Sequence, residues 1–189
     1  MSIGLLSLLG ILAVALITDI RTRRIPNLLV LGGLLSALTY HVIAAPGAGI
    51  LEPAGRAIGL LPALGGIAVG FASLFPLYML RAMGAGDVKL MMMVGAFLGP
   101  LQTFGVVVLT FAAGGVLALF MALWQRSFAQ LALNLRFILT TSAVRAAVGE
   151  SPRFEPLQQT AGRMPYAAAI AAGTLLQLIL VRSGGWALS

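Results

Sequence analysis

The chain has 189 residues, of which 60% are hydrophobic and 9% are charged, and its mean hydropathy of +1.03 excludes an ordinary soluble protein and predicts an all-α integral membrane protein. The net charge of +7 would suit nucleic-acid binding, but the basic residues lie in short segments between apolar runs without interleaved aromatic residues, so we expect no nucleic-acid partner. The absence of cysteine excludes disulfides, thiol catalysis and cysteine-ligated metal, and a single histidine disfavours zinc proteolysis and a Ser-His pair.

Apolar runs of helical length predict about six transmembrane helices in one membrane-embedded domain that covers residues 1–189. Pro26 is expected as the first residue of the second helix, since proline fits that position. The fourth run has only eleven residues before Gly99, which is about 16 Å of helix and roughly half of the hydrocarbon thickness, so a short fourth helix is expected. The expected spans are residues 3–18, 27–43, 57–80, 88–98, 103–124 and 164–181.

Two further features refine this layout. The third run contains small residues that predict close packing against another helix, and prolines that predict kinks. Residues 126–149 combine polar and apolar positions at helical spacing and predict an interfacial helix on the inner leaflet. The small residues are Gly65, Gly66, Gly70 and Ser73, and the prolines are Pro62 and Pro76.

The distribution of positive charge predicts the orientation. Ten of the twelve Lys and Arg residues fall in the first, third and fifth connections between spans, so these connections are expected in the cytoplasm and both termini outside. Asp19 follows the first apolar run and Asp87 precedes the fourth. The two carboxylates, 68 residues apart, are therefore expected at the same cytoplasmic edge of the membrane.

Asp87 belongs to the stretch Gly84-Ala85-Gly86-Asp87-Val88-Lys89. Glycines ahead of an acid allow the chain to bend and let an extended peptide approach. Two carboxyl groups within a few ångströms share one proton, so one can activate water while the other polarises a peptide carbonyl. That chemistry predicts an aspartic endopeptidase.

Simpler interpretations of the two aspartates remain open at this point. Asp87 would be a helix N-cap or pair with Lys89, and Asp19 would pair with Arg21 or Arg23. A proton-coupled small membrane transporter using the same two Asp is the alternative function. It is less favoured, because transporters often show an internal repeat and polar breaks at the midplane, which the sequence lacks.

Two other features are expected to be structural. The run Met91-Met92-Met93 predicts adaptable packing rather than a metal site, since thioether metal sites recruit further ligands. His41 is expected to be an interfacial residue on the outer side. No metal and no cofactor are expected.

Three motifs together resemble those of the type IV prepilin peptidases, which are G-x-G-D aspartic proteases of bacterial membranes. The resemblance implies that Asp19 and Asp87 form the catalytic pair. It also implies that Gly84 and Gly86 shape the loop that presents Asp87, with Lys89 a structural residue of the same loop. The motifs are Asp19-x5-Ile25-Pro26-Asn27, Gly84-x-Gly86-Asp87-x-Lys89 and Pro165-Tyr166-x3-Ile170-x2-Gly173.

The chain is most similar to the short form of that family, because it begins at its first span and lacks the paired cysteines of the methyltransferase region found in long members. Short members resemble the peptidases of tight-adherence systems, which process Flp-type prepilins and pseudopilins. The resemblance implies a multi-pass protein of the bacterial inner membrane without N-methyltransferase activity, whose active site faces the cytoplasm. Its expected partners are prepilin or pseudopilin leader peptides, the lipid bilayer and the pilus assembly machinery.

Overall fold

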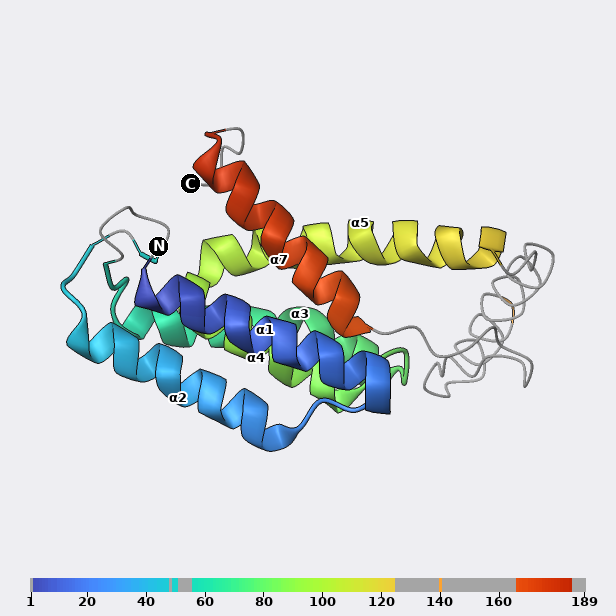
Figure 1. Ribbon diagram of the computed structural model, residues 1–189, viewed down its shortest axis with the longest axis horizontal. Coiled ribbons are helices and arrows are strands. Elements are labelled where there is room, and N and C mark those ends of the chain that lie inside the picture. The colour runs from blue at the N-terminus through green and yellow to red at the C-terminus, as the bar shows by residue number, and fades with distance from the viewer. Residues whose placement is uncertain (1, 48, 51–55, 125–139, 141–165, 185–189) are drawn as a thin grey trace.

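A computed structural model of the chain describes residues 2–47, 49–50, 56–124, 140 and 166–184 (Figure 1). Within these residues the regular elements are all helices, as predicted. Three of them, α1, α3 and α5, are long and apolar enough to cross a membrane, and α2 and α7 are shorter apolar helices. The predicted interfacial helix over residues 126–149 lies outside the described residues, apart from Thr140. The described helices are α1 (Ile3–Thr22), α2 (Asn27–Ile43), α3 (Leu60–Met79), α4 (Ala85–Leu98), α5 (Pro100–Trp124) and α7 (Tyr166–Arg182).

Several helix boundaries differ from those predicted. α1 continues past its apolar run and ends at Thr22. Its C-cap, Arg23, adopts the left-handed conformation with φ 55° and donates its N–H to the Asp19 carbonyl at 2.8 Å. Asp19 therefore lies inside the last turn of α1. Pro26 is the N-cap of α2 and precedes its first helical residue. α5 begins immediately at Pro100, because the first helical position needs no backbone N–H.

α3 begins at Leu60, three residues later than predicted, and only one of its two prolines lies in the helix interior. Pro62 falls in the first turn, where a missing N–H breaks no helical hydrogen bond, so the predicted kink at this position is wrong. Pro76 lies inside the helix near its end.

Glycines on α3 and α4 bring these two helices into close contact, as predicted from the small residues of α3. A Cβ added to Gly66 would collide with the Gly95 carbonyl, and one added to Gly70 would lie 2.7 Å from the Met91 carbonyl oxygen. Without side chains at these positions the two backbones approach directly, which is how helices gain packing energy in an apolar solvent.

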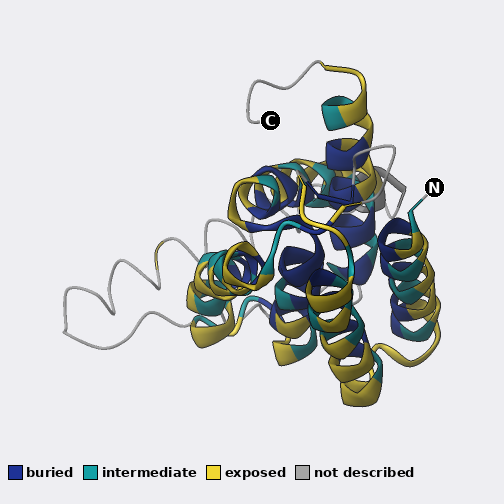
Figure 2. Cartoon of the chain, turned by 90° about the vertical axis from the view of Figure 1, so that its left-hand side faces the viewer, coloured by how far each residue is buried: buried dark blue, intermediate teal, exposed yellow. Residues whose placement is uncertain are grey.

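α4 is the centre of the bundle. It contacts each of the other five described helices, and ten of its fourteen residues are buried. Met91 and Met93 are fully buried in the apolar core, as the packing interpretation predicted. The surrounding helices are buried on one side only: in Figure 2 their buried residues face inward and their exposed residues face outward. Many of these exposed residues are large and apolar, including Leu28, Leu61 and Ile179, as expected of surfaces in contact with lipid.

His41 is buried, so the prediction of an interfacial histidine is wrong. The residue is 5% exposed, and its Nε2 lies 3.0 Å from the Ala96 carbonyl oxygen. Ala96 is in the last turn of α4, where carbonyls have no partner within the helix. A carbonyl only accepts, so Nε2 carries the hydrogen, and His41 satisfies a polar group at the end of the most buried helix.

Candidate active site

The two aspartates of the chain lie at the same end of the helix bundle. Asp19 is in the last turn of α1 and is 7% exposed, whereas Asp87 is in the first turn of α4 and is 8% exposed. This end is on the right in Figure 1, where α1 ends and α7 begins. Two buried carboxyl groups on neighbouring helix ends are unusual in an apolar bundle, because burial strongly disfavours the charged form.

Asp87 is held by the backbone of the glycine-rich turn. Gly84 is the N-cap of α4, and Asp87 follows as the third helical residue, with its Oδ2 accepting the Gly84 N–H at 3.1 Å. The simpler prediction of Asp87 as the N-cap is therefore wrong, although its side chain does cap the helix from the third position. A Cβ on Gly84 would lie 3.3 Å from Asp87 Oδ2, so a larger residue would crowd the carboxylate.

The first and second sequence motifs contact each other directly. Ile25 lies against Gly86, since a Cβ on this glycine would be 3.3 Å from the Ile25 Cβ. Lys89 Nζ donates to Asn27 Oδ1 at 3.0 Å, so the predicted pairing of this lysine with Asp87 is wrong. These contacts join the start of α2 to the start of α4 and fix the turn that carries Asp87.

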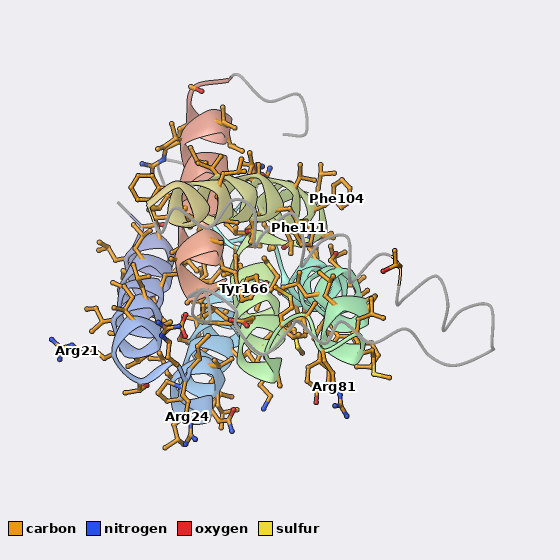
Figure 3. The ribbon with its side chains drawn as sticks, turned by 90° about the vertical axis from the view of Figure 1, so that its right-hand side faces the viewer. Arg21, Arg24, Arg81, Phe104, Phe111 and Tyr166 are labelled. Atoms are coloured by element: carbon orange, nitrogen blue, oxygen red, sulfur yellow. The ribbon has the colours of Figure 1, made fainter. Side chains whose placement is uncertain are left out.

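The third motif contributes through α7. Asp19 Oδ2 accepts a hydrogen bond of 3.2 Å from the backbone N–H of Ala167, the second residue of that helix. Tyr166 is half-buried against the apolar core and interacts electrostatically with Asp87. In Figure 3 Tyr166 lies at the start of α7 amid the helix ends, whereas Arg21 and Arg81 point outward. Pro165 lies outside the described residues.

Sequence reasoning missed Ala167, because a backbone donor has no residue type that marks it. Its only signal is position, since the first turn of any helix has free N–H groups. Arg21 and Arg23, the predicted partners of Asp19, are exposed, and Asp19 forms its side-chain hydrogen bond with α7.

The electrostatics of the site raise the pKa of Asp87. Asp87 precedes the apolar part of α4 and lies outside the three long candidate spans. The pKa of Asp87 is raised to about 6: burial is the main cause, the Gly84 hydrogen bond partly opposes it, and the charge of Asp19 adds a smaller upward contribution. A carboxyl group with this pKa exchanges its proton near neutral pH, as a general acid or base must. Within the described part of the chain no group of three or more potential ligands could hold a metal ion.

The chain was compared with known proteins. No curated protein and no solved structure matches it. A family model described as the type IV leader peptidase family matches residues 6–119, more than half of the chain, and this region contains both aspartates and the first two motifs. The chain therefore belongs to the type IV leader peptidase family, whose members are aspartic peptidases that cleave the leader peptides of prepilins.

Proposed function

We propose that Asp19 and Asp87 are the catalytic pair of this peptidase. The proposal is carried by one observation: these residues, 68 positions apart in the sequence, lie at the same end of the bundle. Both are more than nine-tenths buried there, and they interact electrostatically. The contacts of Ile25 with Gly86 and of Asn27 with Lys89 support it, because they hold the two aspartate-bearing motifs together.

The reaction follows from one proton shared between the two carboxyl groups. The ionised carboxylate takes a proton from a water molecule, whose oxygen attacks the carbonyl carbon of the scissile peptide bond, while the protonated partner donates a hydrogen bond to the carbonyl oxygen. The tetrahedral intermediate then collapses, the C–N bond breaks, and a proton passes to the leaving amine. The leader leaves with a free carboxylate and the mature pilin with a free N-terminus.

The substrate class within the family is the second part of the proposal. We propose that the chain processes Flp-type prepilins or pseudopilins at the cytoplasmic face of the inner membrane.

The proposed arrangement in the membrane is a single domain over the 189 residues, with about six spanning helices, including the short fourth helix, and both termini outside. The concentration of Lys and Arg in alternate connections supports this orientation. The lack of cysteine in these residues supports similarity to the short, non-methylating members.

The test is co-expression with a Flp-type prepilin, scored by the mobility shift that follows loss of the leader. Asp19→Asn and Asp87→Asn are each expected to abolish cleavage, because an amide neither takes nor gives the shared proton. Glu52→Gln, a carboxylate-to-amide change in the predicted outer connection, is the matched control and should cleave normally. Cleavage by either Asn variant would overturn the catalytic pair, whereas failure of the parent protein on Flp-type substrates alone would overturn only the substrate class.

A further inference from the structure

Asp19 occupies an electrostatically unfavourable position on its own helix. It lies in the last turn of α1, where the aligned peptide dipoles and unpaired carbonyls leave a partial negative charge. Burial adds to this effect, since a carboxylate loses hydration when it is removed from water. A reaction that needs one ionised carboxylate therefore needs a compensating group beside Asp19.

The first turn of α7 supplies that group. The N–H groups of a first helical turn have no acceptor within their helix, and the dipole leaves a partial positive charge there. Ala167, in this turn, points its N–H at Asp19 Oδ2 at 3.2 Å. Ala167 is 1% exposed, so the bond is shielded from competing water.

The rest of α7 is packed so that this turn is held in place. Gly173 lies against Thr110 of α5, where a Cβ would be 2.6 Å from the Thr110 backbone nitrogen. One turn further along, Gln177 Nε2 donates to Gln102 Oε1 at 2.7 Å. α7 also contacts α1 and α4, the two helices that carry the aspartates.

We propose that the Ala167 N–H, in the first turn of α7, is a positioning donor of the active site, which orients the Asp19 carboxylate and stabilises it for peptide hydrolysis. The inference rests on the proposed catalytic pair. Among the described residues, the ionisable groups around the site are Asp87 on α4, Tyr166 on α7, which interacts with Asp87, and the exposed Arg21 and Arg23 at the end of α1. The N–H of Ala167 is the neighbouring dipole that opposes the charge of the α1 terminus.

Ala167→Pro removes this donor, because proline has no backbone N–H. Ala168→Pro is the matched control, since it lies in the same first turn, where proline breaks no hydrogen bond within the helix. Ala167→Pro is expected to lower kcat about tenfold to a hundredfold, the effect of losing one hydrogen bond to a charged group, with little change in KM. The acidic limb of its pH–rate profile should move to higher pH, so that raising the pH restores part of the activity. Ala168→Pro should change neither.

A second measurement reads the carboxylate itself. Asp19 and Asp87 are the two Asp residues of the chain, so ¹³Cγ-aspartate labelling gives two side-chain carboxyl resonances, assigned with Asp19→Asn and Asp87→Asn. At a fixed pH the Asp19 resonance should move in Ala167→Pro, which lacks the hydrogen bond to Oδ2, and should stay at the position of the parent protein in Ala168→Pro. If the ring at position 167 prevents folding, lactic acid at this position removes the same N–H by an amide-to-ester change.

The outcomes separate the two proposals. Cleavage by Asp19→Asn or Asp87→Asn overturns the catalytic pair. If both are inactive, and loss of the 167 N–H leaves the Asp19 resonance and the acidic limb unchanged, only the role of the Ala167 N–H is overturned. A lower kcat with an unshifted acidic limb also overturns it, because a purely structural role predicts that result.

Discussion

Replacing Asp87 by asparagine is expected to abolish activity and yet stabilise the folded protein. The physical reason is the cost of holding a charged carboxylate in a buried position, 8% exposed, at the start of α4. An Asn Oδ1 can still accept the Gly84 N–H that Asp87 accepts at 3.1 Å, so the change removes the charge and keeps the cap.

The size and pH dependence of this effect follow from the pKa of Asp87, which burial raises from 3.8 to about 6. The shift is about two units, and at 1.36 kcal/mol per unit it corresponds to about 3 kcal/mol. Because the folded state binds this proton more tightly than the unfolded state, the contribution of Asp87 to the free energy of unfolding falls as pH rises from 3.8 to about 6. The destabilisation caused by the charged Asp87 side chain is therefore complete at about pH 8 and mostly absent at about pH 4.

Thermal unfolding of purified protein in detergent micelles measures this difference. At about pH 8, Asp87→Asn should unfold about 5–10 °C above wild type, whereas at about pH 4 the two should nearly coincide. Glu52→Gln is the control, for which no such pH-dependent gain is expected. A lower Tm for Asp87→Asn at pH 8, or an equal gain at both pH values, would refute the reasoning that desolvation dominates at Asp87.

Three further predictions concern packing, orientation and chemistry. Gly70→Ala should destabilise the protein by about 1–3 kcal/mol, because its Cβ would lie 2.7 Å from the Met91 carbonyl oxygen. Gly10→Ala is the control and should be neutral or stabilising, since no atom lies within 4 Å of its Cβ. Thermal unfolding distinguishes the two variants. In the cysteine-free chain, a Cys introduced at Ser189 should react with an impermeant maleimide on intact spheroplasts, and a Cys introduced at Ser151 should not. The reverse pattern of labelling would invert the proposed orientation. Both positions lie outside the described residues. Pilin cleaved by the purified enzyme with S-adenosylmethionine should retain a free N-terminal amine by intact-mass spectrometry, and an added methyl group of about 14 Da would contradict the absence of methyl transfer.

The sequence predicted the described helices well because each coincides with an apolar run, but it predicted their ends less well. Hydropathy indicates where a chain meets lipid, not where its backbone hydrogen bonds stop. α1 thus continues through polar residues to Thr22, whose hydroxyl donates to the Thr18 carbonyl at 2.8 Å. α5 starts at Pro100, which hydropathy treats as a break although proline fits a first turn.

In the candidate site, too, features that depend on local sequence were predicted, and features that depend on contacts between distant residues were not. Asp19, Asp87 and the glycine turn were found because side chains of special chemistry stand in recognisable motifs. The bond from Ala167 and the burial of His41 against Ala96 were not, since each depends on how a distant helix end packs. Lys89 contacts Asn27 across 62 residues, a pairing that no local spacing predicts.

The central position of α4 has a consequence for how the active site can move. A helix packed against all five other described helices cannot shift without disturbing each of them, so Asp87 is carried by the most enclosed of the described helices. Asp19 lies on α1, which has a face outside the bundle, and within the described part of the chain its side chain accepts one hydrogen bond, from α7. Any adjustment in the distance between the two carboxylates during turnover must therefore come from α1 and α7, with α4 as the fixed reference.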